Sequence, residues 1–208
     1  MHVYRAQAAD LIRQGFEPVF IPGSQGPLFA VYHRPAAGAV DRGDVIYLPP
    51  FAEEMNRSRR MAALQARALA AQGLGVLLLD LHGCGDSGGD FSAARWPAWQ
   101  GDVIAAADWL GGRGRKRVAL WGLRLGALLA ASVAARHPQR FHRLLLWQPV
   151  ASGETFLTQF LRIRLAADMA GGGRYLTRCL EVTSRRSTDW ISPDESPGEA
   201  VFFRNDGA

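Results

Sequence analysis

The sequence has few of the residues that build disulfide frameworks or zinc sites. Its 208 residues include two cysteines, Cys84 and Cys179, which lie far apart without a Cys-x-x-Cys pair or companion histidines. This spacing argues against a disulfide framework and a zinc site, and we expect no metal and no cofactor.

Long apolar runs are also missing: none reaches the ~20 residues of a membrane helix, and residues 1–15 are too polar for a signal-peptide core. We expect no membrane insertion and a cytoplasmic location.

Lysine is almost absent. Lys116 is the only one, and the other basic residues are arginines, with a net charge of +5. Apart from short clusters such as 57–60 and 113–117, the arginines are scattered, whereas a nucleic-acid-binding protein concentrates basic charge on one stripe with aromatic residues interleaved. We therefore predict no nucleic-acid partner and attribute the excess of arginine to coding bias.

The apolar residues predict one α/β domain over residues 1–170, with a mostly parallel sheet and helices on both faces. At 48% apolar composition the chain can bury one sizeable core. Strand-like and helical patterns alternate along it, as in βαβ units. Strands are expected at 16–21, 28–33, 45–49, 75–80, 117–121 and 144–148, and helices at 58–72, 96–110, 154–169 and directly after the strand at 117–121. The Pro- and Gly-rich segment 22–27 predicts an N-terminal antiparallel hairpin. Residues 171–208 are rich in turn formers and charge, so we predict an irregular or disordered tail there.

The most informative motif lies at residues 118–132. A short apolar run is followed by the frame Gly122-Leu-Arg-Leu-Gly126 and then by an Ala- and Leu-rich helical run. This is the context of the G-x-S-x-G nucleophile elbow, in which glycines flank a serine on a sharp strand-to-helix turn. Here the middle residue is Arg124, whose guanidinium is always charged and only donates hydrogen bonds, so it cannot attack a carbonyl carbon.

The order of the motifs resembles that of the α/β-hydrolase superfamily, over roughly residues 15–170. The segments Pro49-Pro-Phe-Ala-Glu-Glu-Met-Asn56, Asp80-Leu-His-Gly-Cys-Gly-Asp-Ser-Gly-Gly-Asp-Phe91 and Leu120-Trp-Gly-Leu-Arg-Leu-Gly-Ala127 are similar to those of the exosortase A system-associated hydrolases of type 2. The resemblance implies a bacterial protein linked to exopolysaccharide production, with a protein partner in an exosortase-linked pathway. It also implies that arginine at the elbow is a family trait. The segment after Gly173 departs from the family pattern, which points to a truncated or frame-altered version.

The catalytic residues stay unassigned. The triad of an α/β-hydrolase runs Ser, then Asp or Glu, then His, and none of the five histidines lies more than one strand after the elbow. The oxyanion hole is mostly backbone. By resemblance, its donors would be the amide of Leu125 and an amide at Phe51 or Ala52.

Arg124 has two interpretations. It can form an internal ion pair with Glu53 or Glu54, in which case breaking a buried pair would cost ~3–5 kcal/mol. Alternatively, it can hold the carboxylate or phosphate of a ligand, since a guanidinium binds both groups bidentately. We favour the internal pair, because a charge at the edge of a sheet is usually neutralised by a neighbouring side chain.

The loop Gly83-Cys-Gly-Asp-Ser-Gly88 matches the G-x-G-x-x-G pattern of dinucleotide-binding sites. That pattern needs a helix opening at the glycines, whereas the next predicted helix begins only at Trp96. We therefore interpret the loop as a structural turn. Cys84 or Ser87 could replace the missing nucleophile only with His82 as base.

Two function classes remain open. One is an enzyme that hydrolyses an ester, thioester or other acyl substrate by an unconventional route. The other is a pseudoenzyme, a non-catalytic hydrolase-fold protein that binds an acyl or anionic ligand, or a partner protein, in the same cleft.

Overall fold

The computed structural model describes residues 15–115 and 117–171. Apart from Gly171, the predicted tail at 171–208 lies outside these described residues. The strands are β1 (Phe16–Gly23), β2 (Gly26–His33), β3 (Asp44–Leu48), β4 (Gly75–Leu79), β5 (Val118–Leu123) and β6 (Phe141–Trp147). The helices are α2 (Glu53–Ala71), α3 (Trp96–Gly112), α4 (Leu125–Arg136) and α5 (Gly153–Gly171), with a short 3-10 helix at Phe91–Ala93.

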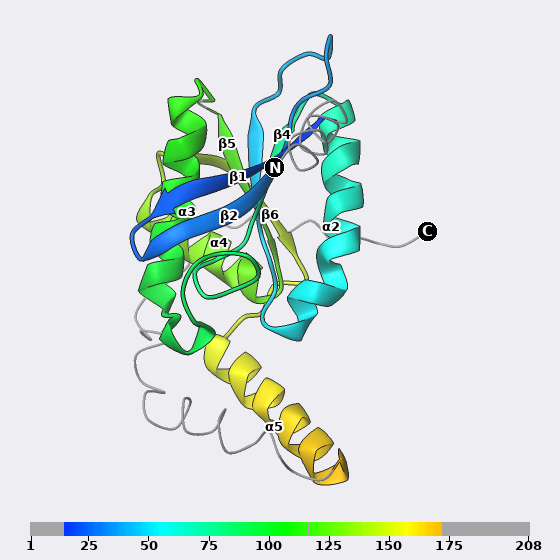
Figure 1. The fold of residues 1–208 in the computed structure, drawn as a ribbon, viewed down its shortest axis with the longest axis vertical. Coiled ribbons are helices and arrows are strands. Elements are labelled where there is room, and N and C mark those ends of the chain that lie inside the picture. The colour runs from blue at the N-terminus through cyan, green and yellow to red at the C-terminus, as the bar shows by residue number, and fades with distance from the viewer. Residues whose placement is uncertain (1–14, 116, 172–208) are drawn as a thin grey trace, which may run out of the picture.

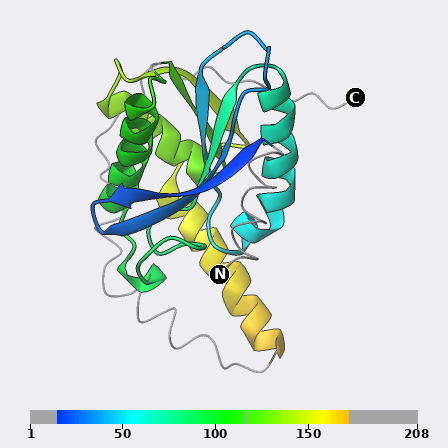
Figure 2. The same cartoon turned by 45° about the horizontal axis from the view of Figure 1, so that its top comes forward.

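The six strands form one mixed sheet in the order β1-β2-β4-β3-β5-β6. The hairpin strands β1 and β2 are antiparallel to each other, and β2 is antiparallel to β4. The strands β4, β3, β5 and β6 run parallel. Figures 1 and 2 show α2 on one face of this sheet and α3 and α4 on the other. The predicted fold class is confirmed.

Alternation along the central strands separates two apolar layers. On β3, Ile46 and Leu48 join the larger core under α3 and α4, whereas Val45 and Tyr47 join a smaller core under α2. Successive side chains of a strand point to opposite faces, so a central strand covered by helices on both sides is apolar throughout. Trp121 on β5 is fully buried in the smaller core, with its ring centroid 4.4 Å from that of Tyr47.

Two predicted boundaries were wrong. Helix α2 begins at Glu53, not at residue 58, because the two glutamates of its first turn stabilise the positive end of the helix dipole. The polar stretch at 56–60 hides the apolar periodicity there. Strand β6 begins at Phe141, not at residue 144, and its two early exposed residues, His142 and Arg143, mask the strand pattern.

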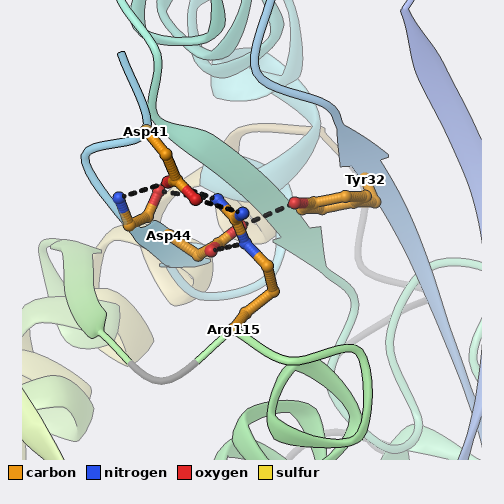
Figure 3. A network of polar contacts seen from close by, with 5 residues as sticks. Tyr32, Asp41, Asp44 and Arg115 are labelled. Atoms are coloured by element: carbon orange, nitrogen blue, oxygen red, sulfur yellow. Dashed lines mark hydrogen bonds and ion pairs between the residues drawn. The ribbon is translucent and has the colours of Figure 1, made fainter.

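A polar network joins the strands at the end of the sheet where β3 begins (Figure 3). The side chain of Asp44 is fully buried, and its two oxygens accept hydrogen bonds from the Tyr32 hydroxyl at 2.6 Å and from the Arg115 Nε. The terminal nitrogens of Arg115 donate to the carboxylate of Asp41, at 2.7 and 2.9 Å. Burial followed by the bond to Asp44 raises the pKa of the Tyr32 hydroxyl. The network ties the hairpin to the parallel strands.

None of the helices in the described ranges is long and apolar enough to cross a membrane.

Candidate functional site

Arg124 occupies a sharp turn between β5 and α4. Its backbone has φ 55° and ψ −112°, a region that residues with a Cβ seldom adopt. Such a conformation costs of order 1–3 kcal/mol and is found where the surrounding structure holds it in place. Here the Arg124 N–H donates to the carbonyl of Trp147 at 2.9 Å, and the Arg124 carbonyl accepts the N–H of Ala127 at 3.0 Å. The turn therefore has the strained strand-to-helix form of a nucleophile elbow.

The two glycines that frame Arg124 are required by close packing. A Cβ on Gly126 would lie 2.2 Å from the carbonyl oxygen of Leu48. A Cβ on Gly122 would lie 2.3 Å from the carbonyl oxygen of Gly126. Real Cβ atoms do not approach backbone oxygens so closely. A side chain at Gly126 would therefore push α4 away from the end of β3, and one at Gly122 would push α4 away from β5.

A second strained junction lies beside the first. Ala52, between β3 and α2, has φ 50° and ψ −126°, almost the same conformation as Arg124. Gln148, directly after β6, also has a positive φ of 46°. Because β3, β5 and β6 are parallel neighbours, all three residues lie at the same edge of the sheet. The N-termini of α2 and α4 meet there, and helix N-termini favour bound anions.

A small cavity of about 20 Å³ lies between the two junctions. Its walls include Phe51, Ala52 and Leu125, three of the residues expected at the site, together with Gly126. Apolar side chains complete the lining, among them Trp96, Trp99 and Leu129. A cavity of this size holds about one water molecule or one ligand oxygen. Arg124 is not part of this lining.

Arg124 pairs with Glu54 across the two junctions. Its Nε lies 3.0 Å from the Glu54 carboxylate, and its Cζ lies 5.4 Å above the ring of Phe156 on α5. Glu53, the other expected partner, occupies the first position of α2. The two paired side chains are 37% and 33% exposed. The expected cost of ~3–5 kcal/mol for breaking a buried pair is therefore wrong here, because a pair so open to water is worth about 1 kcal/mol or less.

The side chains of the loop after β4 make structural contacts within the fold. The Ser87 hydroxyl donates to the carbonyl of Asp80 at 2.6 Å and accepts the N–H of Phe29 at 2.8 Å. Burial raises the pKa of the Cys84 thiol to about 12, so the thiol is protonated at neutral pH. A protonated thiol is a poor nucleophile. Neither side chain is placed to replace a nucleophilic serine.

His82 in this loop is also committed to packing. Its backbone N–H donates to the buried carboxylate of Asp102 at 2.8 Å, and its carbonyl accepts the indole N–H of Trp99 at 3.0 Å. A Cβ on Gly89 would lie 2.2 Å from the imidazole ring, which shows how closely the loop closes over it. Burial raises the pKa of Asp102. His82 does not act as a base for Ser87, because the Ser87 hydroxyl bonds to backbone atoms instead.

Two aromatic side chains of α5, Phe156 and Phe160, pack against Phe51 beside the small cavity. The ring centroid of Phe51 lies 5.1 Å from that of Phe160 and 6.1 Å from that of Phe156. It also lies 5.4 Å from the ring of Phe91, which is 43% exposed. The sequence predicts Phe156 and Phe160 on an amphipathic helix but does not connect them to the elbow. Their spacing of four residues puts both on one face, and it does not show which part of the fold that face meets.

Within residues 15–115 and 117–171, no group of three or more His, Cys, Asp or Glu side chains could hold a metal ion.

The mixed sheet and the strained elbow at its edge define an α/β-hydrolase fold. Residues 42–200 match the family model described as serine aminopeptidase, S33, so the chain belongs to this family. The match runs into the segment predicted as an irregular tail. No curated protein matches the chain.

Solved structures agree with the fold. A serine hydrolase without a lid from Xanthomonas campestris is 25% identical, with a TM-score of 0.56, and the match covers 66% of this chain and 63% of that one. Est1E from Butyrivibrio proteoclasticus, solved with ferulic acid bound, is 19% identical, with a TM-score of 0.58 and coverage of 70% and 56%. A serine hydrolase homologue from Coxiella burnetii is 22% identical, with a TM-score of 0.55 and coverage of 68% and 67%. The chain thus spans 63% and 56% of the first two structures.

Proposed function

We propose that this α/β-hydrolase family protein carries arginine in place of the nucleophilic serine and binds an acyl ligand at the elbow without cleaving it. The observation that carries the proposal is the position of Arg124. It occupies the strained turn between Gly122 and Gly126, where the elbow of a hydrolase presents its serine oxygen, and it is paired with Glu54.

The remaining parts of the site suit binding of a carboxylate or acyl group. The small cavity beside Leu125 and Ala52 admits about one oxygen atom, next to the N-termini of two helices. The bond to Glu54 uses only the Nε of Arg124, so the two terminal nitrogens can meet a carboxylate side by side. The rings of Phe51, Phe91 and Phe160 offer an apolar wall for the rest of the ligand.

A biological setting is part of the proposal. The residues of the segments 49–56, 80–91 and 120–127 support a place in a bacterial exosortase and exopolysaccharide system, in the cytoplasm, with a protein partner of that pathway. In such a system a hydrolase-fold protein without a serine nucleophile would sense or carry an acyl group.

The second candidate is hydrolysis by an unconventional route, favoured by membership of a family of serine aminopeptidases. A fluorophosphonate probe and short-chain nitrophenyl esters separate the two candidates. We expect neither labelling nor turnover above that of buffer, because loss of the serine oxygen alone removes most of the rate enhancement of triad enzymes. Stoichiometric labelling of Ser87, or of any other serine, would overturn the proposal and support the enzyme.

Binding is tested directly by titrating the protein with hexanoate, using hexanol as the uncharged control. We expect saturable binding of hexanoate that weakens about tenfold in Arg124→Gln, since a charge-assisted bidentate contact is lost. Binding that is unchanged in Arg124→Gln would contradict the role given to Arg124.

A further inference from the structure

A second, larger cavity of about 220 Å³ opens between α2 and the strands of the hairpin side of the sheet. We refer to it as the α2 cavity. Aromatic and aliphatic side chains form most of its wall, including Phe16, Phe29, Tyr47 and Leu78. Pro49 and Met55 line both this cavity and the small one at the elbow, so the two cavities lie on either side of the junction between β3 and α2.

The polar groups of the α2 cavity are mostly cationic. Arg59 and Arg67 come from the exposed side of α2, and Asp80 lies at the end of β4. Arg59 donates to Asp80 at 3.0 Å, so its charge is balanced. Arg67 has no carboxylate partner among residues 15–115 and 117–171. The cavity therefore carries one cation that lacks a counter-charge within this part of the chain.

His33, on β2, supplies a second polar group to the α2 cavity. It is only 4% exposed and lines the α2 cavity, yet its ring nitrogens make no hydrogen bond with any described residue. Its ring packs against Phe16 at a centroid distance of 5.7 Å. An imidazole in a cavity beside an unbalanced arginine points to a ligand that accepts hydrogen bonds.

We infer that the α2 cavity binds a small aromatic carboxylate, with its charged group on Arg67 and His33 and its ring among Phe16, Phe29 and Tyr47. The guanidinium matches a carboxylate bidentately, and the aromatic walls suit a flat apolar body. The volume lies below the range of drug-sized sites, roughly 300–1,000 Å³, so a molecule about the size of benzoate fits. A free phosphate does not, because it has no apolar part to occupy these walls.

The state of His33 agrees with this assignment. Burial, together with the positive charge of Arg67, lowers the pKa of His33, so the imidazole is neutral at pH 7. A neutral imidazole donates one hydrogen bond, and Arg67 then supplies the charge that balances the ligand.

Benzoate titration by isothermal calorimetry tests the inference, with benzamide as the neutral isostere. In the Arg124→Gln background, which removes the carboxylate contact proposed at the elbow, we expect one benzoate per chain. Benzamide should bind at least about tenfold more weakly, and Arg67→Gln should lose about tenfold or more in affinity. The matched control is Arg60→Gln, an exposed arginine of the same helix that does not line the cavity, and its affinity should stay within about twofold of the parent. Ala63→Phe should abolish binding by filling part of the cavity that Ala63 lines, while keeping every charge.

Two further measurements keep the result decisive. Circular dichroism and thermal melts of each variant show whether a loss of binding reflects unfolding. Arg124→Gln should retain benzoate binding, which separates this cavity from the elbow and from the proposed function there. No saturable binding of benzoate to the folded parent protein, equal losses in Arg60→Gln and Arg67→Gln, or full binding by folded Ala63→Phe would each overturn the inference.

Discussion

At Arg124, two effects on the stability of the folded chain oppose each other. The pair with Glu54 stabilises the folded chain slightly, because both side chains are about one third exposed and water screens their charges. The backbone at φ 55° destabilises it, because a residue with a Cβ is strained there. A non-glycine residue in such a strained turn is typical of a functional position, since glycine would fit there without strain.

Substitutions at this residue should separate the two effects. Arg124→Ala removes the pair but keeps the strain, so we expect a loss of ~0.5–1 kcal/mol in the free energy of unfolding. Arg124→Gly also removes the strain, so its stability should exceed that of Arg124→Ala by ~1 kcal/mol or more. Urea titration followed by circular dichroism measures both.

Glu54→Gln serves as the control for the pair and should resemble Arg124→Ala. If Arg124→Gly and Arg124→Ala unfold at the same urea concentration, the turn is not strained, and position 124 lacks the defining property of a nucleophile elbow.

The position of helix α4 depends on one residue without a side chain. Its second residue, Gly126, lets the helix approach the carbonyl oxygens of Leu48 and Pro49 at the end of β3. Any residue larger than glycine would move the start of the helix, and with it Leu125, which lines the small cavity.

Gly126→Ala should therefore destabilise the protein by ~2 kcal/mol or more, since the clash is with backbone atoms that cannot turn aside. The matched control is Gly111→Ala in α3, where an added Cβ meets nothing within 4 Å. That variant should be neutral or more stable by ~0.5–1 kcal/mol, because alanine favours the helix. Equal effects of the two substitutions on the urea midpoint would contradict the close approach.

Most helices and strands could be predicted from the sequence. The residues at which they begin and end near the candidate site could not. Apolar runs such as 75–79 and 118–121 identify buried strands because they are hydrophobic on both faces. The start of α2 at Glu53 depends on the turn at Ala52, which has a positive φ because tertiary packing imposes it. An alanine in the sequence does not indicate such a turn. The frame around Arg124 could be recognised because both of its glycines are required. The contact of Phe156 with Arg124 could not, since it depends on where α5 docks.

For the whole molecule, the network of Tyr32, Asp44 and Arg115 holds the hairpin to the parallel strands at the end of the sheet opposite the elbow (Figure 3). The order of the strands, with β4 between β2 and β3, follows from such long-range contacts and from buried layers. It was not predicted from local patterns.

This network should make the fold sensitive to alkaline pH. Burial and the bond to Asp44 raise the pKa of Tyr32 in the folded state, so its contribution to stability is present below the unfolded value of ~10 and is lost as pH rises above it. We expect the free energy of unfolding to fall between about pH 9 and pH 11, and to fall less in Tyr32→Phe. Urea titrations at both pH values measure the difference.

Tyr47→Phe is the matched control. Burial also raises the pKa of Tyr47, but the hydroxyl lies 3.5 Å from that of Ser58 and not against a carboxylate. Its removal should therefore reduce the alkaline loss by a smaller amount. An alkaline loss in Tyr32→Phe as large as in the parent would show that the network does not respond to this hydroxyl.

Strand β6 has a consequence for how the protein behaves in concentrated solution. In the part of the chain that the structure describes, it is the last strand of the sheet, paired with β5 on one side. Edge strands offer unpaired backbone groups to any other extended chain, and exposed charge on them opposes such pairing. Here the half-buried Leu144 and Leu145 favour adhesion, while the exposed Arg143 works against it. Within the described residues, Arg143 therefore opposes pairing along this edge, and anions or high salt that screen its charge should weaken that opposition.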